Sequence, residues 1–180
     1  MKKILVLVLL PLACIAVFAQ NKVNFMITAP DGKYVIEGSD KNYYVFYYEG
    51  QTKEQLYTKT LVGVTKTFVS AKDVVTKVEN SMISINSIKV DSYILGGLVP
   101  IKRTISYNLE FEFKDGKIKV NTPELVYVKD KDGNIGRISD FICSNRNRNE
   151  LGTGWERWLF VNDVINNILA NINNEDSEDW

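Results

Sequence analysis

Histidine is absent from this chain of 180 residues, and cysteine is scarce, with two residues. The absence of histidine excludes Ser-His-Asp and Cys-His catalytic sites, general base catalysis by imidazole and the imidazole ligands of most zinc centres. Residues 130–134 begin like a calcium loop, but position 12 of that loop is Phe141 instead of the required glutamate. We therefore expect no metal and no cofactor, and a simple turn at residues 130–134.

The N-terminal segment has the three parts of an export signal. Met1-Lys2-Lys3 is a basic region, residues 4–18 are an apolar run, and Ala19 fits a cleavage site. The apolar run is shorter than the roughly 20 residues that a transmembrane helix needs. We expect residues 1–19 to be a cleaved signal peptide, a mature chain that begins at Gln20, and a periplasmic or secreted protein.

A lipoprotein is the alternative, because Cys14 follows Leu12-Ala13, although Pro11 is unusual three positions before a lipidated cysteine. If Cys14 leaves with the signal peptide, Cys143 is the only thiol that remains, and it cannot close a disulfide within the chain. Removal of the two signal-peptide lysines leaves 20 basic and 22 acidic residues, a net charge of −2. With no basic excess, we expect no nucleic-acid partner. We also expect no transmembrane segment in the mature chain.

The most regular pattern in the chain runs from Thr104 to Val128. Apolar side chains alternate with polar ones from Ile105 to Phe113, which is the period of a strand with one face against a core. Asp115-Gly116 follows and predicts a hairpin with a type I′ turn, in which both central residues need a positive φ. The return arm continues the apolar face at Ile118 and Val120. The pattern predicts a long hairpin whose apolar face is covered by other elements.

Two helices are predicted to supply that cover. Thr52 and Gln55 form a capping box, and apolar residues that include Leu61 and Phe68 follow as one stripe. Gly63 lies in mid-helix, where glycine costs about 1 kcal/mol relative to alanine, so we expect a close approach between this helix and the sheet.

The second helix is predicted near the C-terminus. Thr153 and Glu156 form a second capping box, and the apolar stripe of the following helix includes Trp158 and Ile165 and ends near Ile172.

Shorter strands are predicted at residues 23–27, 33–37, 74–78 and 82–90, between turn-forming residues. Within residues 82–90 the apolar side chains change from one strand face to the other, which predicts a bulge near Asn86-Ser87. Gly96, Gly97 and Pro100 then predict a flexible connection into the long hairpin.

Tyr43 to Tyr48 is an aromatic strand. Both of its faces are aromatic or apolar, which is typical of a central strand covered on both sides. The alternative is an exposed aromatic platform for a sugar or a peptide, for which Tyr44 and Tyr48 are the candidate binding residues.

The chain resembles a known family in three stretches: Thr52–Tyr57, Lys66–Val75 and Ile105–Lys117. The family is that of exported Bacteroidota proteins with a domain of unknown function numbered 4468, whose fold is described as TBP-like. The resemblance implies an α+β fold in β-α-β4-α order, with two helices packed on one face of an antiparallel sheet, and it supplies no catalytic residues. TBP binds DNA with its sheet, but a shared fold alone does not transfer that activity.

We accordingly divide the chain into four parts. These are the signal peptide (1–19), an N-terminal lead-in (20–41), the TBP-like domain (42–172) with a polar insertion at 129–154, and an acidic C-terminal tail (173–180).

Candidate functional residues lie mainly in the insertion. The insertion and the start of the following helix are basic, through Arg137, Arg146, Arg148 and Arg157. Arg146 and Arg148 are the first candidates for an anionic or acidic partner, although ion pairs with Asp140, Glu150 and Glu156 would also explain these arginines. Glu110 and Glu112 could form a carboxylate pair, but alternation on a solvated sheet face explains them as well. Cys143 fits half-buried packing better than an activated thiolate.

These observations predict an exported, non-catalytic binding or envelope-associated module, whose unknown partner is a protein or glycan of the cell envelope. The alternatives are a carboxylate-based glycan hydrolase and a lipoprotein component of a surface complex.

Overall fold

The computed structural model describes residues 22–94 and 100–173 of the chain. The expected signal peptide, the Gly96-Gly97 connection and the acidic tail beyond residue 173 lie outside these ranges.

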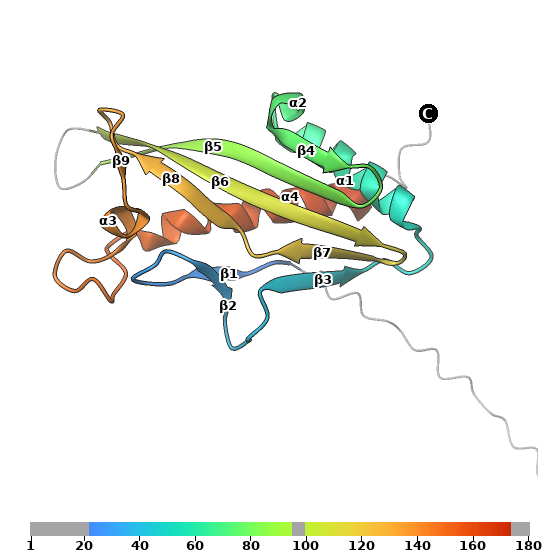
Figure 1. Cartoon of the computed structure of the whole chain (residues 1–180), viewed down its shortest axis with the longest axis horizontal. Coiled ribbons are helices and arrows are strands. Elements are labelled where there is room, and N and C mark those ends of the chain that lie inside the picture. The colour runs from blue at the N-terminus through green and yellow to red at the C-terminus, as the bar shows by residue number, and fades with distance from the viewer. Residues whose placement is uncertain (1–21, 95–99, 174–180) are drawn as a thin grey trace, which may run out of the picture.

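An antiparallel sheet forms the centre of the molecule, with the strand order β3-β7-β6-β5-β4 (Figure 1). These strands are β3 (Tyr43–Tyr47), β4 (Val75–Val78), β5 (Met82–Ile94), β6 (Pro100–Lys114) and β7 (Lys117–Asn121). β8 (Glu124–Lys129) pairs with the first half of β6, and β9 (Ile135–Gly136) pairs with β8. β1 (Phe25–Ile27) and β2 (Tyr34–Ile36) form a separate two-stranded sheet.

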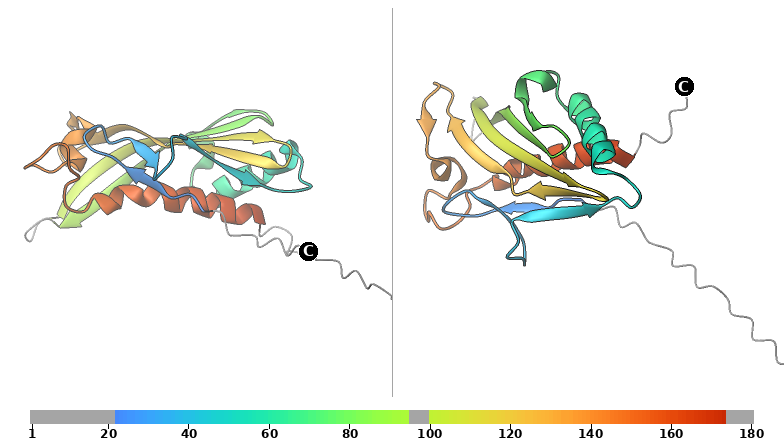
Figure 2. Two further views of the ribbon diagram at one scale, coloured as in Figure 1. Left: turned by 90° about the horizontal axis from the view of Figure 1, so that it is seen from below. Right: turned by 45° about the vertical axis from the view of Figure 1, so that its right-hand side comes forward.

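Two long helices, α1 (Lys53–Thr67) and α4 (Phe160–Asn173), pack on one face of the central sheet and against each other. Figure 2 shows both on the same side of the strands, and Figure 1 views the opposite, open face. Short helical turns complete the chain: α2 (Ala71–Val74), α3 (Ile138–Ile142) and the 3-10 turn η1 (Trp155–Leu159). From β3 onward the order β3-α1-β4-β5-β6-β7, closed by α4, confirms the predicted α+β fold.

The β6–β7 hairpin confirms the predicted strand phase. Leu109, Phe111 and the other odd-numbered side chains from Ile105 to Phe113 are buried, whereas the even-numbered ones between them are half-buried on the open face. The predicted turn type is wrong, because only Gly116 of the two central residues has a positive φ (+69°). A type I′ turn needs a positive φ at both positions.

Helix α1 begins as predicted. Gln55 N–H donates to the Thr52 hydroxyl, and Thr52 N–H donates to the Gln55 side chain at 2.8 Å. The close approach at Gly63 exists, but its partner differs from the prediction. A Cβ at Gly63 would lie 2.6 Å from the carbonyl oxygen of Ile168, so the glycine brings α1 close to helix α4 instead of to the sheet.

Two predictions for the strands are wrong. β5 pairs with β6 in one unbroken register from Met82–Glu112 to Ile94–Pro100, without the expected bulge near Asn86-Ser87. The phase change instead leaves Ile88 and Val90 on the open face, where they are 58% and 62% exposed. The aromatic strand β3 is a terminal strand of the sheet and not a central one.

The predicted capping box at Thr153 is also wrong, although the buried stripe of α4 is confirmed. Gly154 precedes η1 in the left-handed conformation (φ +78°), no side chain caps this turn, and the regular helix starts only at Phe160. Trp158 and Ile165 are buried with the rest of the core, as expected.

The N-terminal lead-in is held to α4 by two asparagines one helical turn apart. Asn162 accepts a hydrogen bond from the N–H of Phe25 and donates one to its carbonyl, both at 2.9 Å. Asn166 does the same with Val23, at 2.8 and 3.2 Å. Each side-chain amide therefore satisfies one residue's backbone pair, as a neighbouring strand would.

Candidate functional site

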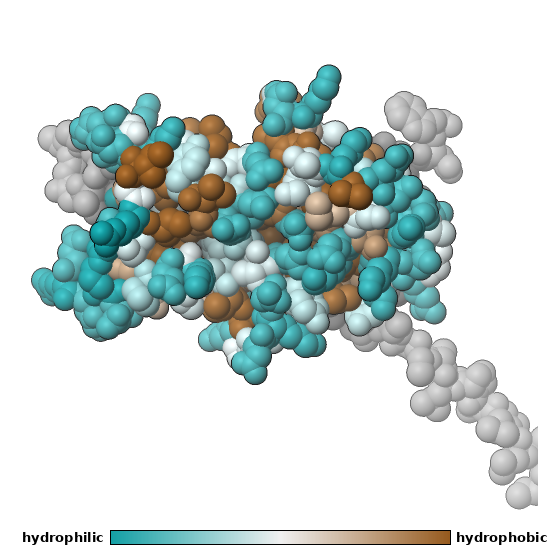
Figure 3. All heavy atoms as spheres, in the orientation of Figure 1, coloured by the Kyte–Doolittle hydropathy of each residue, from teal (hydrophilic) through white to brown (hydrophobic). Residues whose placement is uncertain are grey.

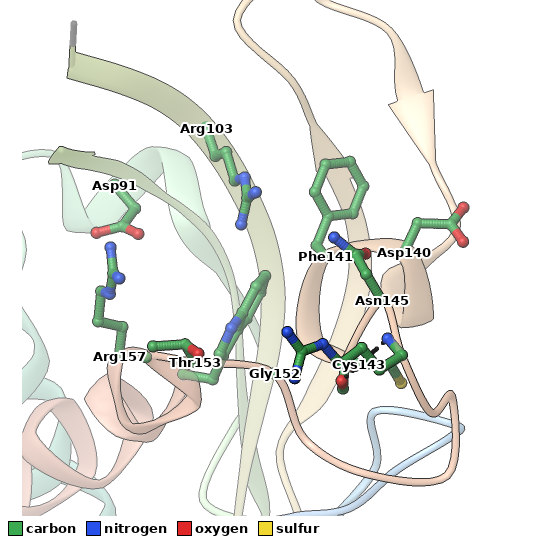
Figure 4. Close-up of a pocket in the computed structure, with 13 residues that line it drawn as sticks. Asp91, Arg103, Asp140, Phe141, Cys143, Asn145, Gly152, Thr153 and Arg157 are labelled. Atoms are coloured by element: carbon green, nitrogen blue, oxygen red, sulfur yellow. Dashed lines mark hydrogen bonds between the residues drawn. The ribbon is translucent and has the colours of Figure 1, made fainter. Parts of the chain in front are cut away.

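A pocket of about 570 Å³ lies where the β5–β6 hairpin meets the polar insertion (Figure 4). Its size falls within the roughly 300–1,000 Å³ that is usual for ligand pockets. Asp91 of β5, Arg103 of β6, Arg146 of the insertion and Arg157 of η1 contribute charged side chains to its wall.

Antiparallel pairing places two of these charged groups together. Asp91 and Arg103 are direct partners in the β5–β6 register, so both side chains project from the same face of the sheet. Arg157 points toward Asp91 from η1 in Figure 4. The guanidinium of Arg103 lies over the ring of Phe141, 5.0 Å from its centroid, which orients this cation at the pocket wall.

The backbone shapes the other side of the pocket. Residues 143–151 form a closed loop, because Cys143 and Leu151 form an isolated bridge and Gly152 N–H donates to the Ile142 carbonyl at 2.7 Å. A Cβ at Gly152 would lie 2.8 Å from the Cys143 carbonyl oxygen, and one at Gly154 would collide with the Arg157 guanidinium. Gly152 therefore permits a backbone contact that a side chain would prevent, whereas Gly154 is favoured by its left-handed conformation (φ +78°).

The two arginines expected to act together have different surroundings. Arg148 forms an ion pair with Asp140 and also donates to the Ser139 hydroxyl at 3.1 Å, so it ties the loop to α3. Arg146 lines the pocket from the exposed tip of the loop, where its backbone N–H donates to Ser144 Oγ. Among the residues that the structure describes, no carboxylate forms an ion pair with the Arg146 guanidinium.

The charge of the pocket wall is predominantly positive. Three arginines and two aspartates line it, and one of these aspartates, Asp140, is already paired with Arg148 outside the wall. In Figure 4 the Asp140 carboxylate points away from the pocket. The guanidinium of Arg146 can form charge-assisted and bidentate hydrogen bonds to a carboxylate or phosphate group.

The candidate aromatic residues lie on the core side of the sheet. Tyr44 packs edge-on against Phe25 at 5.0 Å, and its hydroxyl donates to the Asn24 carbonyl at 3.2 Å. Tyr48 packs against the core, and burial raises its pKa to about 12. The open face of the strand instead carries Tyr47, which is 68% exposed.

The carboxylate pair lies on the open face and is bridged by an amide. Asn121 donates to both Glu110 and Glu112, and Lys119 Nζ lies 2.8 Å from Glu112. The hydrogen bond from Lys119, followed by the one from Asn121, lowers the pKa of Glu112. A general acid of a glycosidase needs the opposite shift.

Cys143 is buried, and its thiol donates to the Pro30 carbonyl at a sulfur–oxygen distance of 3.6 Å. This agrees with the expected packing role.

The turn expected at residues 130–134 is confirmed, because Asp130 accepts hydrogen bonds from the backbone N–H groups of Asp132 and Asn134, both at 2.9 Å. Within the described ranges, no cluster of acidic and cysteine residues could hold a metal ion.

Sequence reasoning missed Asp91 and Arg103 as pocket residues. One observation could have found both. A hairpin centred on Gly97 pairs residues whose numbers are equally far from it, which places residue 91 opposite residue 103.

None of the described helices is long and apolar enough to cross a membrane.

No protein-family model and no curated protein matches the chain. Solved structures of similar fold include the following two. A DUF4468 family protein from Bacteroides ovatus superposes with a TM-score of 0.57 and 13% identity, over 83% of this chain and 91% of that one. A TBP-like protein from Parabacteroides distasonis superposes with a TM-score of 0.52 and 12% identity, over 73% of this chain and 91% of that one. The fold expected from the resemblance is therefore confirmed, and this chain has the TBP-like α+β fold of these Bacteroidota proteins.

Proposed function

We propose that this protein is a non-catalytic binding module that holds a carboxylate group of a protein or glycan partner in the pocket beside Arg146. The observation that carries the proposal is the excess of arginine over aspartate in the wall of a pocket of ligand size.

The arrangement of the arginines supports this role. Arg103 and Arg157 extend from packed elements, β6 and η1, whereas Arg146 lies on the insertion loop and is exposed. A carboxylate that enters the pocket is therefore near arginines from three separate elements. Arg146, which lies on the loop, can adjust its position to the ligand. Loops on a rigid scaffold commonly carry binding residues in this way.

The hydrolase alternative has less support. Glu112 is held in its ionised form by Lys119 and Asn121, and Glu110 shares the same asparagine. Both carboxylates lie on the open sheet face, away from the residues that line the pocket beside Arg146.

We also propose that the chain is an exported member of the DUF4468 family. The support is the basic and apolar segment that ends at Ala19, together with the shared fold. The envelope is then the compartment in which the partner is to be sought. A lipid anchor on Cys14 remains the alternative to cleavage after Ala19.

Titrations followed by two-dimensional NMR of the mature chain test the binding proposal. We expect galacturonate and a short glutamate-rich peptide to shift backbone resonances around residues 143–157, and galactose and the matching glutamine peptide to leave them unchanged. Arg146→Gln should weaken binding about tenfold, as for the loss of one charge-assisted hydrogen bond. Arg137→Gln is the matched control, because Arg137 is also exposed but does not line the pocket. Equal shifts with the charged and neutral probes would contradict the proposal.

A further inference from the structure

β5 has a long edge that no strand of the described chain covers. β4 pairs only with residues 82–85 of β5, so residues 86–94 have a strand neighbour on one side only, β6. Figure 1 shows this edge continuing beyond β4. We call residues 86–94 the free edge of β5. At about 3.3 Å per residue it is roughly 30 Å long, which is unusual for an edge without a proline or a bulge.

The direction of the backbone groups along this edge follows from one hydrogen bond. Phe113 N–H donates to the Ser81 carbonyl at 3.0 Å, which makes residues 81 and 113 a hydrogen-bonded pair. Hydrogen-bonded and non-hydrogen-bonded pairs alternate along an antiparallel ladder. The odd-numbered residues of β5 therefore direct their N–H and C=O groups to β6, and Asn86, Ile88 and Val90 direct theirs outward.

Apolar side chains accompany these outward backbone groups. Ile88 and Val90 lie on the open face and are 58% and 62% exposed. In Figure 3 the apolar surface of the open face gathers over β8 and the neighbouring part of the β5–β6 hairpin. An edge that combines unsatisfied backbone groups with exposed apolar side chains is a template for strand addition.

We propose that the free edge of β5 pairs antiparallel with the same edge of a second copy of this chain, about a two-fold axis at Val90. The inference does not rest on the proposed ligand, but the two sites share one residue, because Asp91 also lines the pocket. In this register residue 86 lies opposite residue 94 of the second copy, and the two Val90 side chains meet at the axis. The pairing uses the whole free edge and stops where β4 begins.

Charge selects this register over its neighbours. Lys89 and Asp91 share the helix-covered face of β5, because both are odd-numbered residues of the strand. With the axis at Val90, Lys89 lies opposite Asp91 of the second copy, in a non-hydrogen-bonded pair in which side chains are close. An axis at residue 89 would place two lysines opposite each other and make the second copy overlap β4. An axis at residue 91 would place two aspartates opposite each other.

The contact is small, so we expect a weak dimer with a dissociation constant in the micromolar range. Sedimentation equilibrium of the mature chain, from about 10 μM to about 1 mM, should show a concentration-dependent dimer. A chain that remains monomeric throughout this range would overturn the proposal.

Cysteine crosslinking tests the position of the axis. Val90→Cys should form an intermolecular disulfide under mild oxidation, because hydrogen-bonded partners lie about 5.5 Å apart between Cα atoms, within the range of a disulfide. Ile88→Cys should not crosslink, because the two cysteines would be four residues apart along the ladder, about 13 Å. Val126→Cys is the matched control, since Val126 is an exposed valine (53%) of β8 away from the edge. Equal crosslinking of the Val126 and Val90 variants, or preferred crosslinking of the Ile88 variant, would overturn the proposal.

Charge at the axis gives a second test. Val90→Lys and Val90→Asp should each raise the dissociation constant at least tenfold, because like charges meet across the axis, and an equal mixture of the two variants should form heterodimers. Val126→Lys should dimerise like the unmodified chain. Because Val90 is 62% exposed, the thermal unfolding of these variants should stay unchanged, which separates a lost contact from a lost fold. Failure of the mixture to associate more tightly than either variant alone would contradict a two-fold axis at Val90.

Discussion

Substitution of Gly63 by alanine tests the contact between the two long helices. In an open helix this change stabilises, because alanine has a helix propensity about 1 kcal/mol better than that of glycine. Here the new Cβ would lie 2.6 Å from the Ile168 carbonyl oxygen, about 0.8 Å closer than an ordinary contact. The neighbour is backbone, so no rotamer change relieves the contact, and α1 and α4 must move apart.

Overpacking of this kind costs about 1–3 kcal/mol. After subtraction of the gain of about 1 kcal/mol in propensity, we expect Gly63→Ala to lower the free energy of unfolding by about 0–2 kcal/mol. Urea unfolding followed by far-UV circular dichroism measures this change. Thr58→Ala, at an exposed position of the same helix, has only the propensity effect and should stabilise by about 0.5 kcal/mol. If Gly63→Ala stabilises the protein as Thr58→Ala does, the two helix backbones are not in close contact.

Four further predictions concern the core, the lead-in, pH and processing. Phe111→Ala should cost about 3–5 kcal/mol of stability in urea unfolding and Glu110→Ala less than about 0.5, and equal costs would mean that the strand phase is wrong. Asn162→Ala should cost about 1–3 kcal/mol, because it leaves a backbone N–H and C=O of β1 buried without partners, and hydrogen exchange should increase in β1 first. Burial holds the pKa of Tyr48 at about 12 while the unfolded chain ionises its tyrosines near pH 10, so stability should fall between these pH values, and less steeply in Tyr48→Phe. Mass analysis of the exported protein should give Gln20 as the first residue, and a diacylglyceryl cysteine at the N-terminus would refute cleavage after the signal peptide.

Local sequence patterns correctly predicted the elements whose conformation depends mainly on residues close to them in the sequence. The period of two in β6 and the capping box at Thr52 needed no knowledge of the rest of the fold, and both are present in the structure. The same reasoning failed at β5, because a change of phase in apolar residues was interpreted as a bulge. Alternation reports which side chains are apolar, whereas the register follows the hydrogen bonds to β6, which continue past Ile88 and Val90.

The pocket depends on contacts between distant segments, so the sequence predicted only part of it. Arg146 was predicted as a binding residue because it lies in a polar insertion, and it lines the pocket, but Arg148 in the same insertion forms an ion pair with Asp140. Arg103 and Arg157 are 54 residues apart and meet at the pocket only through the packing of η1 beside the β5–β6 hairpin. The local sequence of either arginine contains nothing that predicts this meeting.

The asparagine pair of α4 has a consequence for the order in which the chain can fold. The hydrogen bonds of Asn162 to Phe25 and of Asn166 to Val23 join residues that are 137 and 143 positions apart. β1 pairs with the nearby β2, but its remaining partners lie in α4, which is synthesised much later. Contacts of such long sequence separation form late, because closing the intervening chain costs entropy before any contact is gained. β1 accordingly completes its hydrogen bonds in the final stage of folding, when the sheet that precedes α4 has already formed.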